Sequence, residues 1–255
     1  MARKVLLIPA VCALLMLAAQ SDKSYHAERL DVDVVIQPDR SLMVEETVTF
    51  RFVGGPFSYV FREIPTERTD GIVDITAGAD GVAWPHGDGP GEVEIKGGDP
   101  VEVIWHLSPT ADTTQTFTLA YRALGVVART VEADMLEWQA LPDEFDFAFD
   151  DSRVRFAFPP GGTLAGEPEV MAGTATVSAT AGGASFDMQS LSPGDPLVAR
   201  LSFVPGAFTG APPVWLTQQE AQNSFAWIWF VVGAVILIGG LAVFYRATSR
   251  YARTL

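Results

Sequence analysis

The fold is decided by residues 30–52, which read LDVDVVIQPDRSLMVEETVTFRF. Apolar side chains alternate with polar ones on either side of the central PDRS, and a period of two is typical of a strand with one buried face. Pro, Asp and Ser at 38–41 favour a turn. We therefore expect an antiparallel hairpin that joins a strand at 30–36 to a strand at 42–52.

The rest of the body repeats this pattern of short apolar runs separated by Gly and Pro. Further strands are predicted at 59–64, 71–77, 91–96, 101–107, 114–123, 154–158, 175–180, 185–189 and 197–204. The segment with the clearest helical period lies at 131–139. Many short strands with turn signals between them indicate a mostly β protein, folded as a β-sandwich over residues 24–204.

The N-terminal residues 1–19 have the features of a secretory signal peptide. Arg3 and Lys4 precede an apolar run that is too short to cross a bilayer comfortably. Cys12, the single cysteine, lies inside this run. The mature body is therefore expected to have no disulfide and to depend on a packed core for its stability.

The C-terminal residues 225–245, FAWIWFVVGAVILIGGLAVFY, contain no charged side chain. As a helix they would reach about 30 Å, the thickness of a hydrocarbon core. The side chains expected to anchor this helix at the two membrane surfaces are Trp227, Trp229, Tyr245, Arg246, Arg250 and Arg253. The sequence thus predicts a single transmembrane helix in a bacterial cell membrane.

The charge bias across this helix predicts its orientation. The basic tail 246–255 is expected in the cytoplasm, and the large N-terminal domain outside. Residues 205–224, which begin with a run rich in Pro and Gly, are expected to form a stalk between the domain and the membrane.

The domain between these ends is strongly acidic. All 31 Asp and Glu residues of the chain lie between the signal peptide and the transmembrane helix, whereas five of the 17 Lys and Arg residues lie in the two terminal segments. A surface of this charge repels nucleic acid, so we expect no nucleic-acid partner.

Glu46 and Arg62 are the two charged residues that break the apolar pattern. Glu46 shares the parity of Val44 and Val48, and Arg62 that of Val60. A lone charge on a buried face is costly. One interpretation is a partly buried ion pair between Glu46 and Arg62 that fixes strand register. The alternative is that a bulge turns each of them to solvent independently.

Other chemical groups give weaker signals. The acidic run of Asp143, Glu144, Asp146, Asp150 and Asp151 alternates with Phe145, Phe147 and Phe149 and lacks the spacing of a dedicated calcium loop. The histidines His26, His86 and His106 lie far apart and have no cysteine partners, so neither zinc nor another cofactor is expected. Trp84, Trp105 and Trp138 fit either a ligand groove or a core.

Several segments, in order, carry a family resemblance. They are DRSL at 39–42, VEETVTF at 44–50, FREIP at 61–65, Tyr121 with GVV at 125–127, ADMLEW at 133–138, and VRFAFPP at 154–160. Together they resemble the DUF2207 family of predicted membrane proteins over roughly residues 25–205. The resemblance implies an exported N-terminal β domain on a bacterial membrane protein, and it implies no reaction.

The function that fits these features best is binding or assembly at the outer face of the cell membrane, with no catalytic activity. The partner would be a membrane protein or an envelope polymer. Two alternatives are a Ca²⁺-dependent adhesion or sensing module built on the acidic run, and an envelope hydrolase that uses paired carboxylates. The oligomeric state is left open by the sequence.

Overall fold

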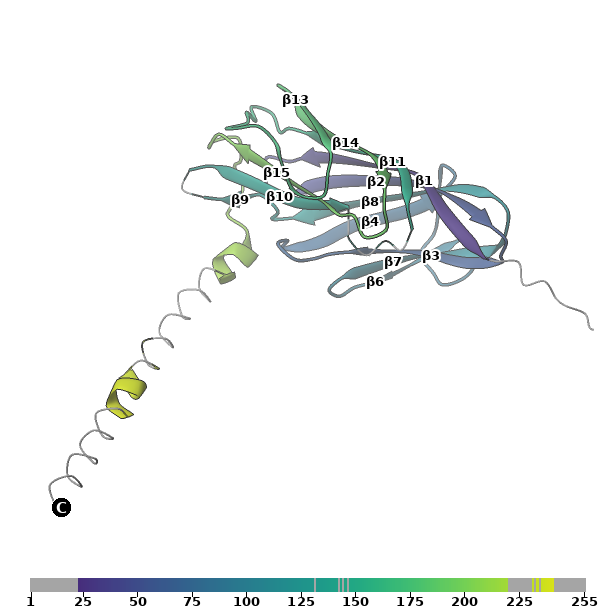
Figure 1. Cartoon of the computed structure of the whole chain (residues 1–255), viewed down its shortest axis with the longest axis horizontal. Coiled ribbons are helices and arrows are strands. Elements are labelled where there is room, and N and C mark those ends of the chain that lie inside the picture. The colour runs from purple at the N-terminus through teal and green to yellow at the C-terminus, as the bar shows by residue number, and fades with distance from the viewer. Residues whose placement is uncertain are drawn as a thin grey trace, which may run out of the picture.

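A computed structural model describes residues 23–130, 132–141, 143, 145, 147–219, 231, 233 and 235–240 of the protein. Strands dominate this part of the chain (Figure 1). They are β1 (Ser24–Ile36), β2 (Leu42–Val53), β3 (Phe57–Ile64), β4 (Gly71–Ala79), β5 (Val82–Ala83), β6 (Glu92–Lys96), β7 (Val101–Thr110), β8 (Thr114–Leu124), β9 (Ala128–Arg129), β10 (Asp134–Leu141), β11 (Phe149–Ala157), β12 (Glu169–Ala172), β13 (Thr176–Thr180), β14 (Gly183–Leu191) and β15 (Leu197–Phe203). The prediction of a mostly β protein is therefore confirmed.

The strands form three sheets. The largest has the order β13-β14-β11-β1-β2-β8-β4-β5, and the two smaller ones have the orders β12-β15-β10-β9 and β3-β7-β6. The hairpin predicted at 30–52 forms the middle of the large sheet, where Val34 lies opposite Val44. β1 also pairs with β11 in parallel, which joins the start of the domain to a strand more than a hundred residues later.

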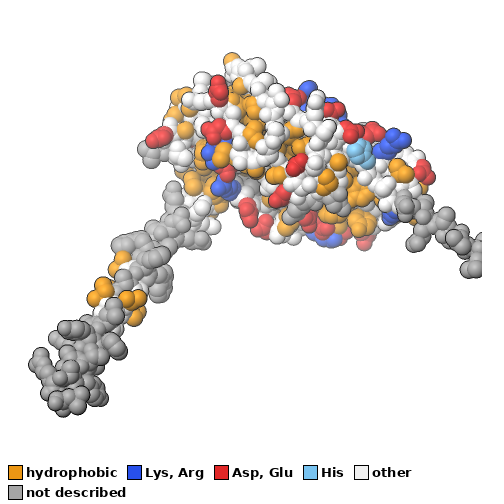
Figure 2. Space-filling model, in the orientation of Figure 1, with side chains coloured by type: hydrophobic (Ala, Val, Ile, Leu, Met, Phe, Trp, Pro, Cys, Tyr) orange, Lys and Arg blue, Asp and Glu red, His pale blue; other side chains and the backbone are white. Residues whose placement is uncertain are grey.

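Both smaller sheets cover the same face of the large sheet. Alternate residues of the central strands, such as Val32, Val44 and Val154, are buried and join one core with side chains from all three sheets. The opposite face is polar. There Arg29 pairs with Asp31, Arg155 with Asp33, and Arg153 with Asp187. Figure 2 shows acidic side chains scattered over the domain surface with basic ones between them.

Residues 131–139 differ from the sequence prediction. The helical period suggested there does not form a helix, because residues 134–141 are strand β10, paired with β15 and β9. Leu136 and Trp138 lie on the buried face of this strand, so the alternation of its side chains, rather than a spacing of three or four, decides the local structure.

The predicted stalk also differs from a free spacer over the residues that are described. Phe208 is buried, the backbone N–H of Thr209 donates to the Pro38 carbonyl (2.9 Å), and the indole N–H of Trp215 donates to the Gly125 carbonyl (2.7 Å). Contacts from residues 208–215 therefore hold this segment against the domain, and a helical turn follows at 214–219. Residues 220–224 lie outside the described part.

The signal peptide predicted at 1–19 and the basic tail predicted at 246–255 also lie outside the described residues. Only part of the predicted span 225–245 is described, and its residues 235–240 are helical. Among the described residues, no helix has the length and apolar character needed to cross a bilayer.

Candidate functional site

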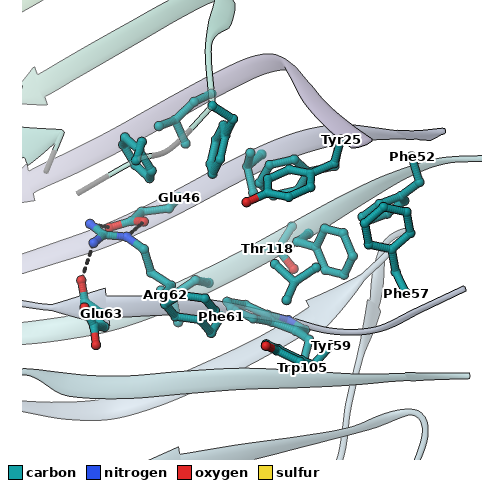
Figure 3. Close-up of a pocket in the computed structure, with 18 of the residues that line it drawn as sticks. Tyr25, Glu46, Phe52, Phe57, Tyr59, Phe61, Arg62, Glu63, Trp105 and Thr118 are labelled. Atoms are coloured by element: carbon teal, nitrogen blue, oxygen red, sulfur yellow. Dashed lines mark hydrogen bonds and ion pairs between the residues drawn. The ribbon is translucent and has the colours of Figure 1, made fainter. Parts of the chain in front are cut away.

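A cavity lined largely by aromatic side chains lies where the 3-stranded sheet meets the large sheet. It has a volume of about 470 Å³ and is lined by strands β1, β2, β8 and β3 and by Phe145, Phe147 and Phe149 (Figure 3). This volume lies within the range of small-ligand pockets, which is roughly 300–1,000 Å³. The site is therefore large enough for a few apolar side chains or a small molecule.

Aromatic rings form most of the cavity wall. Phe50 contacts Phe147 edge-to-face at 5.0 Å between ring centroids, and Trp105 contacts Phe117 in the same way at 5.9 Å. Such edge-to-face pairs hold rings in fixed orientations. The indole N–H of Trp105 donates to the carbonyl of Gly78 (3.0 Å), so its hydrogen-bonding need is met within the protein. The wall is thus preformed and mainly apolar.

One end of the cavity is polar because Glu46 and Arg62 meet there. The Arg62 Nε donates to Glu46 Oε2 at 2.8 Å, and Nη2 donates to Oε1 at 3.1 Å. The Arg62 Nη1 also donates to the backbone carbonyl of Glu63. The structure thus brings together the two charged residues that the sequence singled out on the buried faces of β2 and β3.

Tyr121 of β8 completes this polar end. Its hydroxyl donates to Glu46 Oε1 at 3.0 Å. Burial raises the pKa of the Tyr121 hydroxyl well above its ordinary value, and the negative charge of Glu46 raises it further. The Glu46 carboxylate therefore accepts from a guanidinium on one side and from a hydroxyl that stays protonated on the other.

The mouth of the cavity exposes aromatic side chains. Tyr59 is 58% exposed and Phe61 is 54% exposed, and both line the cavity from β3. Tyr25 lines it from β1, and Lys23 lies over the ring of Phe57, 4.5 Å from its centroid. Large apolar side chains grouped in this way on a surface mark an interaction site more often than single ones do.

The acidic run contributes phenylalanines, rather than carboxylates, to the cavity. Phe145, Phe147 and Phe149 all line it. Asp150 pairs with His26 instead (Nε2–Oδ2 3.0 Å). Glu144 and Asp146 lie outside the described residues. Within the described part of the chain, no three His, Cys, Asp or Glu side chains come together as a metal-binding group.

The remaining candidates of the sequence are dispersed. His106 contacts Glu94 (3.1 Å), and His86 forms an isolated bridge with Val93. Of the tryptophans, Trp105 lines the cavity, whereas Trp138 is buried in the core and Trp84 packs at its margin. The six membrane-anchor residues lie outside the described part of the chain; they are Trp227, Trp229, Tyr245, Arg246, Arg250 and Arg253.

The sequence reasoning missed the cavity, although its components carry a signal. Aromatic residues at 50, 52, 57, 59 and 61 surround the Gly54-Gly55-Pro56 turn, and three more follow at 145, 147 and 149. Two separated aromatic runs in an otherwise Ala- and Val-rich domain suggest a shared lining. Their meeting depends on β3 folding back over the large sheet, which no local pattern reveals.

Comparison with solved structures finds partial similarity at low sequence identity. A candidate protease from Parabacteroides distasonis superposes with a TM-score of 0.44 at 8% identity, over 71% of this chain and 40% of that one. An M1 zinc metallopeptidase from Deinococcus radiodurans gives 0.40 at 11% identity, over 71% and 43%. Native leukotriene A4 hydrolase from Saccharomyces cerevisiae gives 0.42 at 8% identity, over 72% and 30%.

This chain thus spans less than half the length of each of these proteins, and at this level of similarity the comparison supports no functional conclusion. No curated protein sequence matches the chain. A family model described as the N-terminal domain of a predicted membrane protein, DUF2207, matches residues 26–203. The matched range contains all but the first two residues of β1, every strand from β2 to β15, and almost all of the cavity wall. The chain therefore belongs to the DUF2207 family.

Proposed function

We propose that this protein is a binding module of the bacterial envelope and that the aromatic cavity is its ligand site. The observation that carries the proposal is a preformed apolar cavity of about 470 Å³ whose mouth exposes Tyr59 and Phe61. A site of this kind gains affinity from burying apolar surface and gains specificity from a few polar groups. Glu46 and Arg62 supply such groups at one end.

The polar end favours binding over catalysis. The Glu46 carboxylate is held by two nitrogens of Arg62 and by the Tyr121 hydroxyl, a geometry that fixes its position. A general acid or nucleophile needs a carboxylate that can reach a substrate. The carboxylate here is engaged by the protein itself, which suits a structural or orienting role.

The proposed topology places the cavity away from the membrane. Residues 214–219, which precede the proposed transmembrane helix, lie at one end of the domain, whereas the start of β1 and strand β3 lie toward the other (Figure 1). With the domain outside the cell and a single C-terminal anchor, the mouth would face the envelope space. A partner there, rather than lipid of the anchoring membrane, is the expected ligand source.

The calcium and hydrolase alternatives have no comparable observation in their favour. The acidic run turns its phenylalanines into the cavity, and Asp150 is paired with His26. We therefore retain the binding role alone.

A ¹⁹F NMR titration with 5-fluoroindole tests the proposal on the full chain in lipid nanodiscs, with empty nanodiscs as the background. Val48 lines the cavity, and Val48→Phe would fill part of it. Met43→Phe is the matched control, because Met43 lies on the opposite, exposed face of the same strand. We expect saturable binding to the wild type and to Met43→Phe, and at least tenfold weaker binding to a folded Val48→Phe variant. Equal binding to all three proteins would overturn the proposal.

A further inference from the structure

Strand β3 forms one side of the cavity and is also an edge of its sheet. The order β3-β7-β6 leaves β3 with one strand neighbour. An edge strand presents backbone N–H and C=O groups that can pair with another chain.

Hydrogen bonds in the neighbouring strands settle the direction of the backbone groups. The carbonyl of His106 in β7 accepts from the N–H of Gly91 (2.7 Å), so His106 faces β6. Backbone groups alternate in direction along a strand, so Trp105 and Val103 face β3. Trp105 lies opposite Val60, and Val103 opposite Arg62.

Phe61, which lies between these two positions, and Tyr59, which precedes Val60, therefore turn their N–H and C=O groups away from β7. Among the described strands, none pairs with β3 on that side. The same two residues carry the exposed aromatic side chains at the cavity mouth, and their rings lie 6.4 Å apart between centroids. Free backbone groups and an apolar recess thus occur side by side.

The other sheet edges in the described part of the chain are short, covered or without aromatic side chains. β5 and β9 contain two residues each, and β12 contains four. The outer side of β6 is covered, because Val93 donates to the carbonyl of Pro85 (2.9 Å) and accepts from the N–H of Gly87 (3.0 Å). β13 carries Thr, Ser, Ala and one Val, without an aromatic ring. Natural proteins shorten, cover or charge their edges to avoid unwanted pairing, so an eight-residue edge strand with two exposed aromatic side chains stands out.

We propose that an extended peptide segment of a partner protein binds as an added strand along β3. Its backbone bonds to Tyr59 and Phe61, and every second side chain enters the aromatic cavity, a mode that combines backbone pairing with side-chain pockets. The inference rests on the proposed function, because it uses the cavity as the ligand site. The formal net charge of −14 favours a segment that alternates apolar residues with neutral or basic ones.

The probe is a ten-residue peptide, selected from a random phage-displayed library on the full chain in lipid nanodiscs. Two N-methylated forms are then synthesised, one with methyl groups on the odd backbone amides and one on the even amides. An added strand turns alternate amides toward β3, so we expect one form to bind at least tenfold more weakly and the other to bind like the parent. Equal affinities of the two forms would exclude strand addition.

A protein variant gives an independent readout. Phe61→Pro removes the outward N–H, and a proline is tolerated at an edge because no ladder bond is lost there. Phe61→Ala removes the ring but keeps the N–H. We expect Phe61→Pro to bind the peptide roughly tenfold more weakly than Phe61→Ala does. Equal affinities of these two variants would contradict the use of the backbone edge.

The outcomes separate this inference from the proposed function. If Val48→Phe weakens peptide binding but N-methylation of the peptide and Phe61→Pro do not, the cavity remains the ligand site and strand addition is rejected. A library that yields no binder, while 5-fluoroindole still binds, would reject the peptide as ligand. If mass photometry shows a dimer that Phe61→Pro dissociates, β3 pairs with a second copy, and the inference of a separate partner is wrong.

Discussion

Arg40 and Asp134 form an ion pair in which both side chains are 0% exposed and Nη2 lies 2.9 Å from Oδ1. The same guanidinium donates to the carbonyl oxygens of Val127 and Gly210, each at 3.0 Å. One side chain in the β1–β2 turn thus connects β10, the segment before β9, and the segment after β15. The sequence reasoning placed Arg40 only in a turn.

Replacing Arg40 should be among the most damaging single changes in the domain. Arg40→Ala leaves Asp134 buried without its main partner, so we expect the free energy of unfolding to fall by about 3–5 kcal/mol. Arg122→Ala is the control, because Arg122 pairs with Asp39 at the surface, and there the expected loss is below about 1 kcal/mol. Urea unfolding of both variants measures the difference. Similar losses of unfolding free energy in the two variants would show that burial does not make the Arg40–Asp134 pair more important than a surface pair.

Tyr121 should make the domain sensitive to alkaline pH. Burial and the nearby Glu46 raise the pKa of its hydroxyl in the folded state, so its contribution to stability is complete below roughly pH 10 and is lost as the pH rises above that value. Tyr121→Phe should be less stable at pH 8, because Glu46 loses a donor, and should lose less further stability between pH 9 and 11. Urea midpoints measured between pH 9 and 11 give the slope of stability against pH, and Tyr59→Phe, a change at an exposed tyrosine, is the control. A slope unchanged by Tyr121→Phe would contradict the assignment.

Glu137 should make the domain sensitive to acid. Burial acts to raise its pKa, but the hydrogen bond from Arg200 and the positive charge of Arg68 outweigh this effect and lower it. The pairing therefore stabilises the fold fully above roughly pH 4, and this contribution is lost as the pH falls through the lower folded pKa. Glu137→Gln should flatten the loss of stability between pH 5 and 3, and exposed Glu132→Gln should not. Thermal unfolding at each pH measures the effect. If the pairing has no effect, Glu137→Gln and the wild type would lose the same stability between pH 5 and 3.

Asp70 should hold the start of the C-terminal helical segment. Its carboxylate accepts from the backbone N–H groups of Val214 (3.0 Å) and Trp215 (3.1 Å), as an N-cap side chain does, although it comes from a loop 144 residues earlier. Asp70→Ala should speed amide hydrogen exchange at residues 214–219 by at least fivefold and should change exchange in the large sheet little. Glu67→Ala, an exposed change in the same loop, is the control. Unchanged exchange at 214–219 would mean that Trp215 alone holds the segment.

Local patterns predicted most of the large sheet. Alternation identified β1, β2 and β8, because each buries a single face, and it singled out Glu46 and Arg62 because a charge interrupts that face. These features depend only on neighbours along the strand.

The features that the sequence did not reveal depend on contacts between distant segments. The side-chain spacing at 131–139 suggests a helix, but pairing with β15 makes residues 134–141 a strand. The Pro- and Gly-rich run at 205–213 looked like a spacer, yet Phe208 packs into the core. The cavity arises from the crossing of β3 over the large sheet, so its phenylalanines could not be distinguished from ordinary core residues.

The hydrogen bonds of Arg40 also constrain when the domain can finish folding. The acceptors of its guanidinium lie 87, 94 and 170 positions later in the chain. In a chain synthesised from its N-terminus, residues 24–53 of β1 and β2 leave the ribosome well before Gly210. The Arg40 guanidinium therefore cannot complete its buried hydrogen bonds until Gly210 has left the ribosome.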